Sequence, residues 1–148
     1  MKQKTGCVYK ILPLVNLVLQ IHIGDNDYRD FKNLKQSIIN DKEFNHEFNF
    51  IIDLRDAHIK MTTDEFIKYA KLVTKLHTPI NPIKFAILTN TPEHVVCSIL
   101  FELNECNNLL ICKAFSSLHH SLLWIYGEKF ENDYILEAII LNEKKYIQ

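Results

Sequence analysis

The sequence predicts an α/β fold: a mixed, largely parallel sheet of four or five strands, flanked by helices and preceded by an N-terminal antiparallel hairpin. Two observations predict this class. Segments with strand character alternate with segments of helical periodicity along most of the chain. Several strand segments, such as residues 50–52 and 83–89, are apolar without alternation, which is typical of parallel strands covered on both faces. A chain of 148 residues, 47% hydrophobic, is long enough for one such domain.

The first two strands are expected to form the hairpin. Residues 9–13 have the character of a short strand, and residues 14–16 follow as a turn. From residue 17 to residue 23, apolar side chains alternate with positions that include Gln20 and His22, a period of two that predicts a half-buried strand ending at Gly24. Because the connection is tight, we expect the two strands to be antiparallel.

Capping signals place the next two helices. Asp25 or Asn26 is expected to cap a first helix that runs to about residue 40 on an apolar stripe. Polar residues 41–49 then form a loop before the strand at 50–52. Thr62 and Glu65 have the spacing of a capping box, which predicts a second helix ending before Pro79.

The rest of the chain continues the alternation. After the strand at 83–89, Pro92 is expected to open an unusually apolar helix to about residue 105, and residues 109–115 are expected to form another strand. Ser116 or Ser117 is expected to cap a fourth helix that ends at Gly127. We therefore expect one α/β domain over residues 1–127. Residues 128–148 form a tail, most simply an amphipathic helix with a strand as the alternative, which belongs to the same domain or to a dimer contact.

Composition excludes several classes of function. The near balance of 17 basic and 18 acidic residues lacks the electrostatic footprint of a nucleic-acid binder. Polar residues interrupt the apolar runs and the N-terminal segment, so neither membrane insertion nor a signal peptide is expected, and we expect a cytoplasmic protein. The cysteines have no zinc-binding spacing and are expected to be reduced, and no metal or cofactor is expected. They are Cys7, Cys97, Cys106 and Cys112.

One polar group stands out. Asp53, Arg55, Asp56 and His58 follow the strand at residues 50–52. In open α/β sheets, ligands bind beyond the carboxyl ends of the strands, where these side chains are expected to lie. Charge-assisted hydrogen bonds that anchor the following loop are the favoured interpretation of Asp53 and Arg55, and a ligand-binding or catalytic role is the alternative.

The order and spacing of four short motifs resemble the SpoIIAA-like branch of the STAS superfamily, the sulfate-transporter and anti-sigma-factor-antagonist domains. That branch has a strand ending in Asp-Leu/Val-Arg, a Lys/Arg-x-Ala strand, a strand ending in Phe, and a final helix closing on Ala-Leu-x-Trp-Leu. The matching stretches here are Ile52-Asp53-Leu54-Arg55, Lys84-Phe85-Ala86-Ile87-Leu88, Lys113-Ala114-Phe115-Ser116 and Ser121-Leu122-Leu123-Trp124-Ile125.

The resemblance implies a non-enzymatic module that binds proteins or, in some relatives, lipids and nucleotides. In the antagonists, a phosphorylated Ser at the start of the helix after the central strand switches partner binding, and Thr62 and Thr63 stand at the corresponding place. The sequence departs from the family there, because Lys60-Met61-Thr62-Thr63 replaces the Asp-Ser-Ser-Gly stretch. Capping by itself also explains both threonines.

Three functions follow from these observations. The leading expectation is a non-enzymatic interaction or regulatory module with an unidentified protein partner and a possible homodimer contact through the tail. A carrier of a small apolar ligand or lipid is the alternative, motivated by the apolar helix at 92–105 and by Trp124. An enzyme that uses Asp53, Asp56 and His58 as acid–base groups is the least favoured.

Overall fold

The computed structural model describes residues 5–91 and 109–128. Strands and helices alternate along these ranges after an initial pair of strands. In chain order they are β1 (Gly6–Leu12), a short 3-10 helix η1 (Pro13–Val15), β2 (Leu17–Asp27), α1 (Tyr28–Ile39), β3 (Asn49–Lys60), α2 (Thr63–Leu76), β4 (Ile83–Leu88), β5 (Leu110–Phe115) and α4 (Leu118–Tyr126).

The five strands form one sheet in the order β1-β2-β3-β4-β5. Strands β1 and β2 are antiparallel, and each later neighbour is parallel to the one before it. The short connection between β1 and β2 is η1, which ends at Asn16 in the left-handed conformation with φ 56°. The predicted fold class and the N-terminal antiparallel pair are therefore confirmed.

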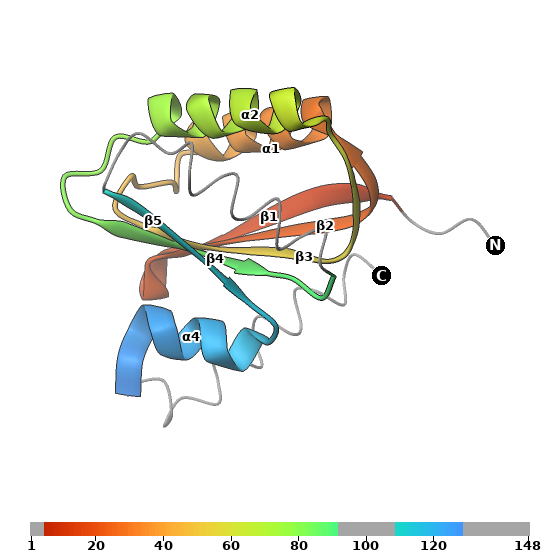
Figure 1. Cartoon of the computed structure of the whole chain (residues 1–148). Coiled ribbons are helices and arrows are strands. Elements are labelled where there is room, and N and C mark those ends of the chain that lie inside the picture. Colours follow the sequence, from red (N-terminus) through yellow and green to blue (C-terminus); the bar gives the residue numbers. More distant parts are fainter. Residues whose placement is uncertain (1–4, 92–108, 129–148) are drawn as a thin grey trace.

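Helices cover both faces of the sheet. Figure 1 shows α1 and α2 side by side on one face and α4 on the opposite face. The core under α1 and α2 contains Val18 of β2, Phe50 of β3 and Phe85 of β4. The core under α4 contains alternate residues of the same strands, such as Leu19 and Ile51. A central strand thus contributes to two cores, which explains the apolar runs without alternation.

The prediction that β2 is half-buried is wrong. Both of its faces are covered from Leu17 to Gly24, and the polar residues Gln20 and His22 are 0% exposed. Their alternation with apolar residues suggested a solvated face, but the face that carries them lies beneath α1. Polar side chains at these positions require hydrogen-bond partners inside the protein.

The predicted start of the first helix is also wrong. Strand β2 continues past Gly24 to Asp27, and Asp27 caps α1 by accepting a hydrogen bond from the Asp30 N–H. Asn26 does not cap the helix because its side chain is buried and turned toward the strand, where its amide donates to the Ile23 and Gly24 carbonyls. Asp27 and Asp30 form a reciprocal capping box.

The later capping predictions are confirmed within the described residues. Thr62 and Glu65 form the capping box of α2, Ser117 caps α4, and Gly127 ends it. The predicted helix at 92–105 and the tail at 129–148 lie outside the described residues. Within the described ranges, neither Cys7 nor Cys112 forms a disulfide, and burial raises the pKa of Cys7 to about 11.

Helix α4 is fixed at its carboxyl end by two hydrogen bonds to the rest of the domain. The Lys84 ammonium donates to the Trp124 carbonyl at 2.7 Å, and the Tyr126 hydroxyl donates to the Val15 carbonyl at 2.9 Å. A cation near the last carbonyls of a helix also interacts favourably with the helix dipole. The contacts join α4 to β4 and to the turn between β1 and β2.

Candidate functional site

The polar group that begins at Asp53 lies within a strand. We predicted that β3 ends near Ile52, but it continues to Lys60, so the expected position of these residues in a loop is wrong. Strand β4 pairs with β3 only as far as Asp53, opposite Leu88. Strand β2 pairs with β3 up to Lys60, opposite Asp27. The second halves of β2 and β3 therefore form a ribbon that extends past the end of β4.

A β-bulge interrupts β3 where the ribbon begins. Asp53 pairs with Ile21 and Asp56 pairs with Ile23, so Leu54 and Arg55 together face the single residue His22. Such an extra residue reverses which positions of a strand point to each face. Before the bulge, Phe50 belongs to the core under α1 and α2, and after the bulge Ile59 belongs to the same core, although the two residues are an odd number of positions apart.

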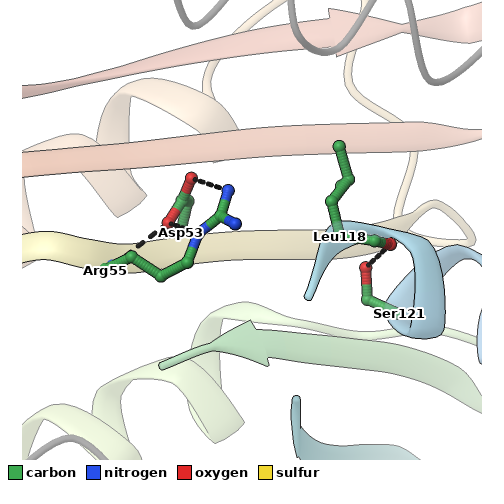
Figure 2. Close-up of polar contacts among 4 residues, drawn as sticks. All are labelled: Asp53, Arg55, Leu118 and Ser121. Carbon is green, nitrogen blue, oxygen red and sulfur yellow. Dashed lines mark hydrogen bonds and ion pairs between the residues drawn. The ribbon is translucent and has the colours of Figure 1, made fainter. Parts of the chain in front are cut away.

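Asp53 and Arg55 form a close ion pair at the bulge. Figure 2 shows the Arg55 side chain folded back along β3 onto the carboxylate. Arg55 Nε donates to Asp53 Oδ1 at 3.0 Å and Nη2 donates to Oδ2 at 3.0 Å. The Arg55 backbone N–H also donates to Oδ1 at 3.1 Å. The carboxylate therefore supplies an acceptor to the backbone at the point where the strand register shifts.

Burial and charge make this pair a structural contact. Asp53 is only 4% exposed, and an ionised carboxylate at such a site requires a charged partner. The hydrogen bond with Asp53, together with its negative charge, raises the pKa of Arg55. A bidentate geometry fixes both side chains in one orientation.

The same face of the sheet receives the first turn of α4. Ile51 lies two residues before Asp53 on β3 and packs in the core that contains Leu118. The buried Ser121 hydroxyl donates to the Leu118 carbonyl at 2.6 Å, as Figure 2 also shows. This polar group is satisfied within its own helix.

Beyond the bulge, the outer side of the ribbon carries exposed charged side chains from both strands. Asp56 and His58 are exposed, and the register places His58 opposite Asp25 and Lys60 opposite Asp27. We name this surface the ribbon strip, made of Asp25, Asp27, Asp56, His58 and Lys60. Asp56 and His58 were predicted from the sequence. Asp25 and Asp27 were missed because a helix, capped by Asp25 or Asn26, was expected to begin directly after Gly24.

Thr62 and Thr63 follow directly after the ribbon. Both are exposed. The Thr62 hydroxyl accepts from the Glu65 N–H at 3.2 Å, and the Glu65 carboxylate accepts from the Thr62 N–H at 3.1 Å. All six predicted site residues, from Asp53 to Thr63, therefore lie on β3 or at the turn from β3 into α2. Asp53 is buried and paired with the partly exposed Arg55, whereas Asp56, His58 and the two threonines lie on the surface.

Trp124 has contacts with the domain itself. Its ring lies 5.4 Å from the Phe115 ring and 5.2 Å from the Lys84 ammonium. Over residues 5–91 and 109–128, no group of three or more His, Cys, Asp or Glu side chains is arranged to hold a metal ion. Within the same ranges, no helix combines the length and the apolar character needed to cross a membrane.

Comparisons with known proteins support the fold. No family model matches the chain, and no curated protein matches it. Among solved structures, the chain is similar to an uncharacterised protein of the DUF3478 family from Shewanella loihica PV-4, which is described as having a SpoIIAA-like fold. The TM-score is 0.58 at 11% sequence identity, and the match covers 84% of this chain and 98% of that chain. The fold of the chain is therefore SpoIIAA-like, as the sequence motifs implied.

Proposed function

We propose that this SpoIIAA-like domain is a non-enzymatic interaction or regulatory module, and that the ribbon strip and the adjoining Thr62 turn form its binding surface for a protein partner. The observation that carries this proposal is the separation of roles along β3. The buried carboxylate of Asp53 is held by Arg55, whereas the charged residues beyond the bulge face solvent. Regular hydrogen-bonded strands hold the surface in place.

The charge pattern of the strip suits a polar protein surface. Three carboxylates, a lysine and an imidazole alternate across two neighbouring strands. Patterns of both signs recognise a complementary pattern and reject surfaces that place like charges together. Such interfaces weaken as salt concentration rises, because exposed charges are screened.

The same geometry argues against acid–base catalysis. A catalytic use of Asp53 with Asp56 and His58 requires a carboxylate that is able to exchange a proton with a substrate. Both oxygens of Asp53 accept hydrogen bonds from Arg55, and its side chain is buried. His58 lies five positions further along the strand, beyond the bulge and on the exposed ribbon.

Thr62 offers a means of regulating this surface. It is exposed at the junction of the ribbon and α2, and it caps a helix of 14 residues. Phosphate at the beginning of a helix is stabilised by the helix dipole and by free N–H groups. A phosphate on Thr62 would add negative charge beside Lys60 and change the charge pattern that a partner meets.

The carrier alternative receives less support. The apolar helix that motivated it falls in residues 92–105, outside the described residues. Trp124, the second motivation, packs against Phe115 and Lys84. The interaction module is therefore the better account of the residues that the structure describes.

Affinity capture with matched charge variants tests the proposal. The full-length protein is used as bait in a native-cell extract, alongside the double variant Asp56→Lys/His58→Glu. Glu43→Lys is the control, because Glu43 is exposed in the connection between α1 and β3, before the amino end of β3. We expect a specific partner, quantified by mass spectrometry, to be captured by the wild type and the control and to fall at least roughly tenfold with the double variant, the loss that about 1.4 kcal/mol of binding energy gives.

Two outcomes would contradict the proposal. One is a partner captured equally by the wild type and the double variant, which would place the interface elsewhere. The other is turnover of a small molecule by the wild-type protein that disappears in Asp53→Asn while the folded state is retained.

A further inference from the structure

A fully buried lysine lies under α1. Lys35 is 0% exposed, and its ammonium group donates to Gln20 Oε1 at 2.9 Å. The same nitrogen lies 4.1 Å from the centre of the Phe50 ring and 5.5 Å from that of Phe85. Over residues 5–91 and 109–128, no carboxylate forms an ion pair with it. A buried ammonium without a carboxylate partner is costly, so the site favours the uncharged amine.

The hydrogen bonds continue from Gln20 along β2. The Gln20 amide nitrogen lies 3.4 Å from His22 Nε2, and His22 Nδ1 lies 3.1 Å from Asn26 Oδ1. The Asn26 amide nitrogen donates to the carbonyls of Ile23 and Gly24, so its oxygen faces His22 as an acceptor. We name this chain of side chains the Lys35 cluster: Lys35, Gln20, His22 and Asn26.

The order of donors and acceptors in the cluster requires a neutral imidazole. Because Asn26 Oδ1 accepts, the proton of His22 is assigned to Nδ1, and Nε2 then accepts from the Gln20 amide. If His22 took up a second proton, its Nε2–H and the Gln20 amide N–H would both be donors, and no hydrogen bond could form between them. Rotation of the Gln20 amide would relieve that conflict but would turn its nitrogen toward Lys35, which removes the acceptor of the lysine.

The titratable groups that face the cluster from other elements compensate only in part for burial: the Cys112 thiol favours a charged Lys35, but its influence is smaller than that of burial. Tyr69 comes from α2, His77 directly follows that helix, Cys7 comes from β1 and Cys112 from β5. Tyr69 hydrogen-bonds the Gln20 side chain, and burial raises its pKa. His46 acts on His77, whose pKa it helps to lower. The charge of Asp53 raises the pKa of His22, but this effect is smaller than the lowering by burial. Asp53 is also committed to Arg55.

We propose that the Lys35 cluster is a proton-sensitive latch, which holds α1 and α2 on the sheet while Lys35 and His22 are uncharged and loosens them when these groups take up protons. Burial lowers the pKa of Lys35 to about 7 and that of His22 to about 4. Both folded-state values lie below the ordinary ones, so protonation favours the unfolded state. The free energy of unfolding is therefore highest, as far as Lys35 is concerned, above the ordinary lysine pKa near 10.4. It decreases as pH falls from there toward 7, the pKa of Lys35 in the folded protein.

Equilibrium unfolding in urea from pH 7 to pH 9 tests the latch. The measured quantity is the equilibrium constant of unfolding of the wild type divided by that of Lys35→Met. Taking the ratio removes the effect of thiols and other titrating groups that both proteins contain. We expect this ratio to change by nearly tenfold per pH unit, equivalent to about 1.4 kcal/mol. Lys32→Met, a half-buried lysine of the same helix, is the control and should follow the wild type. Parallel profiles for wild type and Lys35→Met would overturn the proposal.

A direct titration keeps the test decisive if Lys35→Met does not fold. The side-chain ¹³Cε signal of Lys35, assigned by comparison with Lys35→Arg, is followed by NMR in the wild-type protein. We expect a midpoint near pH 7, accompanied by shifts in the backbone amides of α1 and α2 and not in those of α4. A midpoint near 10.4, the ordinary value for lysine, would overturn the proposal. A midpoint near 7 with no response in α1 or α2 would also overturn it.

Discussion

Arg55 holds both carboxylate oxygens of Asp53 at the bulge of β3. The guanidinium contacts are 3.0 Å each, and the Arg55 backbone N–H adds a further hydrogen bond to Oδ1. The two residues are only two positions apart, so the pair braces the strand locally at the point where β4 ends and the ribbon begins. Everything proposed for the ribbon depends on this shape.

Asp53→Asn should lower the free energy of unfolding by about 1–3 kcal/mol, since it removes the charged acceptor of the partly buried Arg55 guanidinium. Urea denaturation at neutral pH measures the change. Asp56→Asn, on the exposed part of the same strand, is the matched control and should change stability by less than about 0.5 kcal/mol. Equal effects of the two substitutions would contradict the structural role of the pair.

Thr62→Ala should destabilise the protein by about 1 kcal/mol, because the hydroxyl accepts the Glu65 N–H at the start of α2. Thr63→Ala is the control, since Thr63 is the first residue of the helix and alanine favours helical backbone. Thermal unfolding monitored by circular dichroism compares the two. A larger loss for Thr63→Ala would show that the capping assignment is wrong.

His77→Leu should stabilise the protein, and more so in acid. His77 is 1% exposed, and neither of its ring nitrogens has a hydrogen-bond partner among residues 5–91 and 109–128. Burial lowers its pKa to about 2, so the unfolded state takes up the proton first as pH falls below 6.5. The advantage of His77→Leu should grow by about 1.4 kcal/mol per pH unit between pH 6 and pH 5.

Urea titrations at several pH values measure this advantage. His58→Leu serves as the control because its imidazole is on the surface. If the profiles of His77→Leu and wild type stay parallel down to pH 5, His77 is not buried as a neutral base.

The tail is expected to join two copies of the chain. The sequence of residues 131–145 predicts an apolar stripe that requires a cover, and a symmetric homodimer is the commonest closed assembly. Light scattering should give a dimer for the full-length protein and a monomer after removal of residues 130–148. A monomeric full-length protein at micromolar concentration would contradict the dimer and favour docking of the tail on its own domain.

The sheet and its capping were predictable because their signals are local. Apolar runs identified β3 and β4, and the spacing of Thr62 and Glu65 fixed the start of α2. The ribbon was not predictable in this way. Strand β2 ends in Asp25, Asn26 and Asp27, which are all polar, so no apolar pattern indicates that the strand continues past Gly24. The bulge lies at the Asp53–Arg55 pair, and hydrophobic periodicity does not report where a strand gains an extra residue.

The Lys35 cluster was missed for a different reason. Lysine is almost never fully buried, and the polar residues of β2 were assigned to a solvated face. One signal was present: Lys35 stands four residues after Phe31 and three before Ile38, within the apolar stripe of α1. Its acceptor comes from β2 and its ring contacts come from β3 and β4, so only the assembled fold reveals the site.

The interaction proposal is tested most directly by NMR mapping of the captured partner on the ¹⁵N-labelled full-length protein. We expect the partner to shift the backbone amides of Asp56, His58 and Thr62 and to leave those of the α1–β3 connection around Glu43 unaffected. The shifts should diminish at high salt. Perturbations confined to another surface, with the ribbon unchanged, would show that the ribbon strip is not the binding surface.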